Sequence, residues 1–172
     1  MTISLYDISI PVLIRGLTSL SGILRKAAAY ADDKGIPHAQ LIEGRLAADM
    51  AALPFQIQVA TDVARKSAGR LSGGSVEHLS LEETEKTFEE LQARIQKSID
   101  FLQRVDRGAI DGREDEPVVM KPPNGLELKF TGQTYLFRYS LPNFFFHVTT
   151  AYGILRQAGV PLGKADYIGS IA

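Results

Sequence analysis

The chain has 172 residues, of which 45% are hydrophobic, so it is long and apolar enough for one domain with an ordinary core. Its 19 basic and 20 acidic residues leave a formal net charge of -1, and this balance predicts neither a nucleic-acid nor a membrane partner. The absence of cysteine excludes disulfides, thiolate metal sites and a catalytic thiol. Because the N-terminal residues also lack the pattern of a signal peptide, we expect a cytoplasmic protein with a single domain over residues 1–172.

The first predicted helix has apolar residues three or four positions apart, which places them along one helical face. They are Ile10, Leu13, Leu17, Leu20, Leu24, Ala27 and Ala31. Pro11 fits a first turn, or kinks a longer helix that begins near Ser4. The charged residues before Gly35 and Pro37 predict where this helix ends.

The second predicted helix continues to Leu71 with the same spacing of apolar residues. They are Leu46, Met50, Leu53, Ile57, Ala60 and Ala64. Asp49 is a candidate N-cap residue, and Pro54 then falls just past the first turn, where we expect a local kink. The sequence Ser72-Gly73-Gly74-Ser75 predicts the loop that follows.

The third predicted helix begins at a candidate capping box, formed by Ser80 and Glu83. Its apolar face consists of Phe88, Leu91, Ile95, Ile99 and Leu102. A β-hairpin is predicted next, with strands over Pro117–Lys121 and Leu126–Phe130 and a turn at Pro122-Pro123-Asn124-Gly125. We expect Leu126, Leu128 and Phe130 to pack on the helices, because they alternate with charged residues.

The fourth predicted helix follows Thr131, a candidate cap, and Pro142 predicts a kink within it. Its apolar face consists of Phe137, Leu141, Phe144, Val148, Ala151 and Leu155. The uncharged run over residues 139–155 is shorter than the ~20 apolar residues of a membrane-spanning helix, so we interpret it as a buried helix. The tail over Leu162–Ala172 is expected to follow the surface or to be disordered.

Four amphipathic helices can bury their apolar faces only against one another. The predicted fold is therefore mainly α, an up-down four-helix bundle with a small β-hairpin between the third and fourth helices. The hairpin is too small to be stable alone and must pack on the bundle.

The candidate chemistry lies around His147, which flanks the buried face of the fourth helix. A half-buried imidazole can serve as a metal ligand or a general base, or can simply hydrogen bond to a neighbour. If the second and fourth helices face each other, Asp49 meets His147, and Asn143 lies one helical turn away. These three residues could bind a divalent metal such as zinc, nickel or manganese. The alternative is a helix cap at Asp49 and a buried polar network at the other two residues.

Other residues give weaker indications. His38 and His78 fall in predicted loops, where exposure is the expected state. The aromatic triplet Phe144–Phe146 covers more than one helix face, so part of it could pack in the core, line a pocket or form a dimer interface. The sequence has no P-loop, GxGxxG, HExxH or GxSxG motif.

Three stretches of the chain resemble an uncharacterised, mostly bacterial family that is grouped with the DinB/YfiT-like metalloenzyme superfamily. They are Ser4–Asp7, Arg45–Met50 and Leu141–Tyr152, and the last of them is the most specific. The resemblance covers almost the whole chain and implies a four-helix bundle. It implies no established activity for the family itself.

The resemblance also implies where a metal site would lie. Metal-binding members of the superfamily use one histidine on the second helix and two histidines, four residues apart, on the last helix. His147 matches the first of the last-helix pair, but the second position holds Ala151. The second-helix position matches Asp49 or a neighbour, since no histidine lies between His38 and His78. Some relatives transfer or isomerise groups through low-molecular-weight thiols, and many form dimers.

Three functional hypotheses follow. The first is a non-catalytic DinB-like protein without a cofactor, whose pocket holds a small molecule or nothing and which forms a homodimer. The second is a metal-dependent hydrolase or thiol-linked transferase that uses the altered set Asp49, Asn143 and His147. The third is a stress or regulatory module that binds a protein partner through one face of the bundle.

Overall fold

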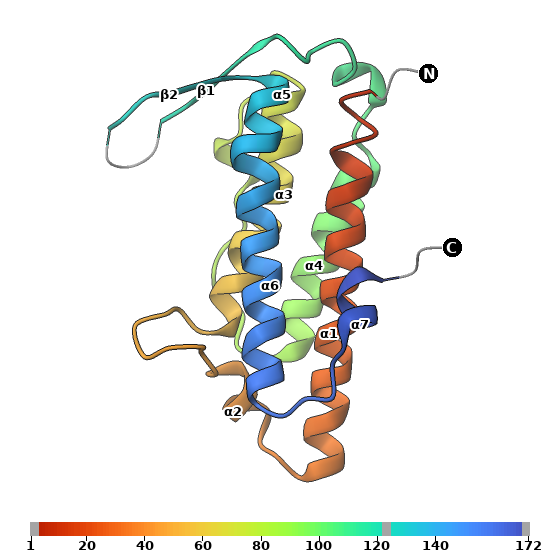
Figure 1. Cartoon of the computed structure of the whole chain (residues 1–172), viewed down its shortest axis with the longest axis vertical. Helices are drawn as coiled ribbons and strands as arrows, with labels where there is room; N and C mark the ends of the chain where they lie inside the picture. The colour runs from red at the N-terminus through yellow and green to blue at the C-terminus, as the bar shows by residue number, and fades with distance from the viewer. Residues whose placement is uncertain (1–3, 122–124, 170–172) are drawn as a thin grey trace.

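Four long helices form a bundle in the computed structural model, which describes residues 4–121 and 125–169 (Figure 1). They are α1 (Ile10–Lys34), α3 (Leu53–Leu71), α4 (Phe88–Gln103) and α6 (Leu141–Gln157). Shorter elements complete the chain: α2 (His38–Ile42), β1 (Pro117–Met120), β2 (Leu128–Thr131), α5 (Gly132–Tyr135), a π-helical turn (Leu136–Ser140), α7 (Lys164–Ile168) and two 3-10 turns (Glu77–Leu79 and Arg107–Ala109). The predicted mainly-α bundle, with its hairpin between the third and fourth long helices, is confirmed.

The helix directions do not simply alternate, which corrects the up-down order within this bundle. α3 and α4 run parallel, because Arg94 of α4 contacts Thr61 whereas the later Lys97 contacts the later Arg65. The connecting residues 72–87, which we call the return segment, run back along α3. Leu79 lies at Arg65 and Glu85 lies at Gln58. α1 and α3 each pack against both α4 and α6.

α1 follows its prediction closely. All seven apolar residues of its predicted face are fully buried. Pro11 lies in the first turn, where its missing N–H leaves no hydrogen bond broken. Gly35 ends the helix with a φ of +64°, a left-handed conformation that glycine adopts without steric cost.

The beginning of α3 differs from its prediction. The N-cap residue is Ala52, and Asp49 lies in the exposed loop before it, so the assignment of Asp49 as N-cap is wrong. Leu46 and Met50 lie in the same loop, where Leu46 is 37% exposed. Pro54 therefore falls within the first turn of α3 and does not require a kink.

α4 begins later than its prediction. Its capping box is formed by Thr87 and Glu90: the Glu90 N–H donates to Thr87 Oγ1 at 3.2 Å, and the Thr87 N–H donates to Glu90 Oε2 at 3.1 Å. The predicted box at Ser80 and Glu83 is wrong, because those residues belong to the return segment along α3. The predicted apolar face from Phe88 to Leu102 is buried as expected.

The chain from Thr131 to Gln157 forms one helical run with a π-helical turn in its middle. Thr131 caps it as predicted, by accepting a hydrogen bond from the Thr134 N–H at 3.3 Å. A π turn holds about one residue more than an α turn and so rotates the preceding residues about the axis. Leu136 is consequently buried and Phe137 is 51% exposed, the reverse of the prediction for Phe137. From Phe144 onward the predicted buried face is correct.

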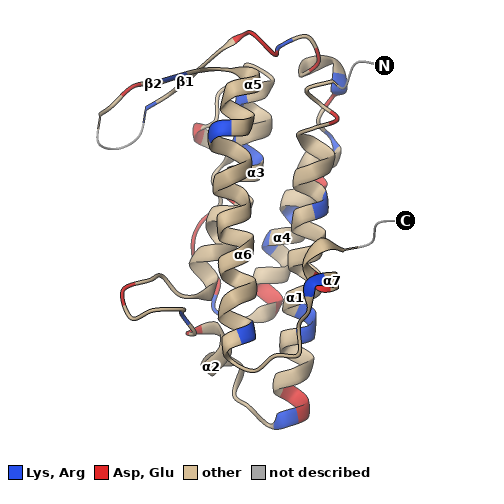
Figure 2. Ribbon diagram, viewed as in Figure 1, with Lys and Arg blue, Asp and Glu red and all other residues tan. Residues whose placement is uncertain are grey.

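The uncharged run is interpreted correctly as a packed helix. α6 carries no charged residue from Leu141 to Leu155, and Figure 2 shows this length of ribbon without charge. Among the residues that the structure describes, no helix is both long and apolar enough to cross a membrane.

The hairpin pairs β1 with β2 in antiparallel register, with Val118 opposite Phe130. The predicted turn at residues 122–124 lies outside the described residues, and Gly125 has a φ of +78°. The expectation that Leu126 packs on the bundle is wrong, since Leu126 is 60% exposed. Leu128 and Phe130 pack half-buried against the core as expected, and Val118 and Met120 of the first strand are buried as well.

The C-terminal segment follows the surface of the bundle, one of its two expected states, as far as it is described. Val160 and Leu162 are buried, and α7 then packs on α1. Arg15 donates to the Ile168 carbonyl at 3.0 Å, and Lys26 forms an ion pair with Asp166 at 2.5 Å. Burial of two apolar side chains and these polar contacts together order the segment up to residue 169.

Candidate functional site

His147 is nearly buried, with 9% of its surface exposed, and it faces α3. Its Nδ1 lies 2.8 Å from Oε1 of Gln56, whose amide group donates to the Ala51 carbonyl at 3.0 Å. Since Oε1 can only accept, this arrangement assigns the proton to Nδ1 and leaves a lone pair on Nε2. Burial lowers the pKa of His147 below its ordinary value of 6.5, which also favours the neutral imidazole.

Among the described residues, no side-chain hydrogen bond or ion pair joins the three predicted site residues. Gln56, rather than Asp49, is the residue that contacts His147, and Asp49 is exposed in the loop before α3. Asn143 is half-buried and lines a cavity beside the hairpin. Within residues 4–121 and 125–169, no group of three or more His, Asp or Glu side chains could hold a metal ion. One imidazole beside a neutral amide does not fit the three-histidine site that the resemblance implies.

The remaining histidines lie elsewhere. His38 packs its ring edge against Phe88 and lies 3.0 Å from an Asp32 carboxylate oxygen, and His78 is exposed. In the aromatic triplet, Phe144 is fully buried whereas Phe146 is 56% exposed with its ring edge on His147. Phe144 is therefore a core residue, as one interpretation predicted, whereas a dimer interface at Phe146 stays a prediction.

Asn143 lies at a cleft between α3, α6, the hairpin and the return segment. It consists of two neighbouring cavities of about 780 and 380 Å³ that share Lys66, Arg70, Met120 and Lys121 as lining residues. The smaller cavity is also lined by Tyr139 and Asn143. We call the two cavities together the hairpin cleft. The volume of each cavity taken singly lies in the range of small-molecule pockets.

A network of buried hydroxyl groups supports the wall of this cleft. Ser67 Oγ lies 3.1 Å from the Tyr135 hydroxyl and 2.6 Å from Ser140 Oγ. Arg70 Nη1 donates to the Tyr135 hydroxyl at 3.2 Å. Tyr139, one turn after Tyr135, stacks on it with ring centroids 5.8 Å apart. The network therefore connects the π-helical turn to α3, and it fixes Arg70 at the cleft.

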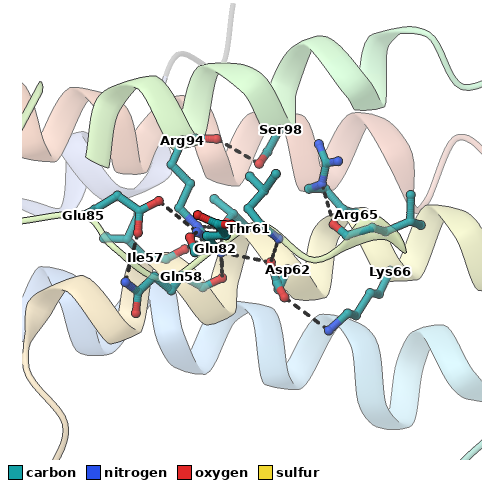
Figure 3. A network of polar contacts seen from close by, with 12 residues as sticks. Ile57, Gln58, Thr61, Asp62, Arg65, Lys66, Glu82, Glu85, Arg94 and Ser98 are labelled. Atoms are coloured by element: carbon teal, nitrogen blue, oxygen red, sulfur yellow. Dashed lines mark hydrogen bonds and ion pairs between the residues drawn. The ribbon is translucent and has the colours of Figure 1, made fainter. Parts of the chain in front are cut away.

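A second polar network, shown in Figure 3, fastens the return segment to α3 and α4. The Arg94 side chain is 1% exposed and forms ion pairs with Asp62 at 3.0 Å and Glu85 at 2.9 Å. It also donates to Thr61 Oγ1 at 2.8 Å. Burial raises the pKa of Glu85, but hydrogen bonds from Gln58 and Arg94 outweigh it and hold that pKa below its ordinary value.

Sequence reasoning did not find these two networks. In the sequence, Arg94 lies between the apolar positions of α4, which is the usual place of an exposed charged residue. Its partners are distant in sequence, so no local pattern indicates the network. One signal was available for the first network: Ser67 and Arg70 are three residues apart and so share one face of α3.

The packing of α1, α3, α4 and α6, with a histidine of α6 facing α3, defines a DinB-like helical bundle. The crystal structure of a DinB family member protein from Shewanella denitrificans is similar to this chain with a TM-score of 0.87 and 32% identity. The match covers 97% of this chain and 93% of that one. Residues 5–168 match the family described as domain of unknown function DUF1993, and the chain belongs to this family. No curated protein matches the chain.

Proposed function

We propose that this DinB-like protein binds a small molecule in the hairpin cleft. The observation that carries the proposal is the pair of neighbouring cavities that converge on Arg70 and Lys66, beside the aromatic ring of Tyr139. A concave site with convergent polar groups is a usual form of a ligand pocket, and here polar and charged side chains make up much of the lining. Asn143, one of the residues selected from the sequence, also lines this cleft.

Two side chains in the wall of the cleft are held in place before any ligand arrives. Met120 is buried on the hairpin side, and Arg70 is fixed through the Tyr135 hydroxyl. A preformed site avoids the free-energy cost of ordering side chains on binding. This rigidity supports ligand binding by α3, α6 and the hairpin, rather than by the exposed loop that holds Asp49.

The proposal is tested by screening a collection of metabolites against the purified protein with thermal shift and amide NMR spectra. We expect a binding compound to shift resonances of α3, of residues 117–121 and of residues 139–143. The variant Asn143→Trp should fill the smaller cavity and abolish those shifts. Arg138→Trp, an exposed position on the same helical run, is the matched control and should bind normally. Compounds that shift only distant resonances, or that bind Asn143→Trp equally well, would contradict the proposal.

The metal-dependent alternative, with Asp49, Asn143 and His147 as ligands, stays a second proposal. One observation favours it: among the described residues no hydrogen bond is made to Nε2 of His147, so its lone pair is available. Metal analysis of the purified protein with zinc, nickel and manganese tests it. Stoichiometric metal that is lost in both Asp49→Ala and His147→Ala would support a metal centre. The absence of binding by the unaltered protein would refute it.

A further inference from the structure

We propose that the hairpin cleft selects ligands that carry a carboxylate or phosphate group, and that Arg70 of α3 binds this group. The inference rests on the proposed ligand-binding function and names its ligand class. It depends on how the charges around the cleft are already paired.

Both cavities share three cations, and among the described residues Arg70 is the one of them without an acidic partner. The structure gives it one side-chain hydrogen bond, to the neutral hydroxyl of Tyr135, and no acid in the described part of the chain forms an ion pair with it. A guanidinium group has five N–H donors in a planar fork that matches carboxylate and phosphate oxygens. Most of these donors are therefore available at the cleft.

The other charges of α3 explain why Arg70 has no acid. α3 contains three cations, Arg65, Lys66 and Arg70, but a single acid, Asp62. Asp62 already contacts Arg94 at 3.0 Å and Lys66 at 3.2 Å. The second acid at Arg94, Glu85, also points into that network. The acids near α3 are thus paired with the buried Arg94. They lie one helical turn or more away from Arg70.

Among the described residues, four acids line the cleft. Asp62 is half-buried but already pairs with Arg94 and Lys66, whereas Glu77, Glu83 and Glu127 lie at the exposed rim, two of them with partners of their own. Glu77 is exposed and accepts hydrogen bonds from the Ser75 hydroxyl and the Val76 N–H. Glu127 lies 3.3 Å from Lys129 and 3.7 Å from Lys121. Glu83 is exposed on the return segment. Solvent and salt screen exposed charges more strongly than half-buried ones, so Arg70 should dominate the selection of the ligand's charge.

The Tyr135 contact determines the direction of the guanidinium group. Tyr135 is fully buried, and the guanidinium carbon of Arg70 lies 5.7 Å from its ring centroid. Ser67 and Ser140 hold the Tyr135 hydroxyl through the buried hydrogen bonds described above. A fork that is already oriented loses less side-chain freedom when an anion binds, which favours selective recognition.

The test uses four probes of similar size on the full-length protein: benzoate, phenyl phosphate, neutral benzamide and cationic benzylamine. Amide NMR titrations should place benzoate or phenyl phosphate in the hairpin cleft, at least about tenfold tighter than benzamide, as expected for a charge-assisted hydrogen-bonded pair. The stronger of these two anions then distinguishes a carboxylate ligand from a phosphate ligand. Equal binding of benzamide in the cleft would overturn the anion inference but leave the ligand-binding proposal intact.

The variants Arg70→Gln and Arg70→Lys give the decisive comparison. We expect Arg70→Gln to weaken binding of the anion at least about tenfold and Arg70→Lys to restore part of it, because lysine keeps the charge but not the fork. Arg138→Gln, which removes a charge from an exposed position, should change nothing, and circular-dichroism melting verifies that each variant folds. Unchanged anion binding in a folded Arg70→Gln variant, or tighter binding of benzylamine, would overturn the inference. If no probe shifts cleft resonances, the anion inference fails, and the metabolite screen with Asn143→Trp decides the proposed function separately.

Discussion

Replacement of Arg94 by methionine should destabilise the bundle by about 3 kcal/mol. Methionine fills a similar volume but removes the cation between Asp62 and Glu85, whose side chains are 14% and 11% exposed. Breaking a fully buried ion pair from one side costs about 3–5 kcal/mol, because a charge remains without its partner. The slight exposure of both acids places the expected loss at the lower end of that range. Urea unfolding followed by circular dichroism measures it.

The matched control is Arg104→Met, which removes an exposed arginine just after α4 and should change the free energy of unfolding by less than about 0.5 kcal/mol. A loss below about 1 kcal/mol for Arg94→Met would refute the reasoning, since it would mean that solvent already shields the network. In the double variant Arg94→Met with Glu85→Gln, part of the lost stability should return, because one uncompensated charge is gone.

The dependence on pH gives a second measurement of the same network. The folded pKa of Glu85 lies below its ordinary value of 4.5, so its contribution to stability is full above about pH 4.5. That contribution is lost as the pH falls through the lower folded pKa. The stability difference between the unaltered protein and Arg94→Met should therefore shrink in acid. A difference that stays constant down to pH 3 would contradict the assigned ion pair.

Three further predictions concern packing, capping and assembly. Gly16→Val should lower the melting temperature by several degrees, because a Cβ at this position would collide with the ring of Phe144; an unchanged melting temperature would disprove the close approach. Thr87→Ala should cost about 1 kcal/mol of unfolding free energy, whereas Ser80→Ala should cost less than about 0.5 kcal/mol, and equal losses would refute the observed capping box. The expected homodimer would use the exposed aromatic surface of α6. Phe146→Glu should therefore convert dimers to monomers, as measured by light scattering at several protein concentrations. A protein that is strictly monomeric before mutation would refute the dimer.

The apolar faces of the long helices could be predicted because they depend on local periodicity. α1 and α4 bury the residues that the spacing selects, and α6 does so after Phe144. The errors occur where a distant contact outweighs a local signal. Ser80 and Glu83 have the form of a capping box, but Arg94 and Asp62 hold their segment against α3 instead.

The candidate site was less predictable than the fold. His147 was correctly placed beside the buried face of its helix, yet its partner is Gln56, whose amide carries no sequence signature of a site. The π-helical turn changes the phase of the last helix and brings Tyr139 to the cleft. The nearest sequence signal is Pro142, which predicted a kink but not the extra residue in the turn before it. Asp49 was misplaced because Leu46 and Met50 keep the helical spacing of apolar residues although they precede Leu53, where α3 begins.

The return segment has a consequence for the dynamics of the bundle. Residues 80–86 form no helix or strand, and they are attached chiefly through side chains of α3 and α4. A segment attached in this way can detach without unfolding the helices, so its amides should exchange with deuterium earlier than those of α3 and α4. Detachment would separate Glu85 from Arg94 and leave the arginine with Asp62 alone. Arg94 makes two of these attachments, to the Glu82 carbonyl and to the Glu85 carboxylate, so the same guanidinium group links motion of the surface segment to the stability of the bundle.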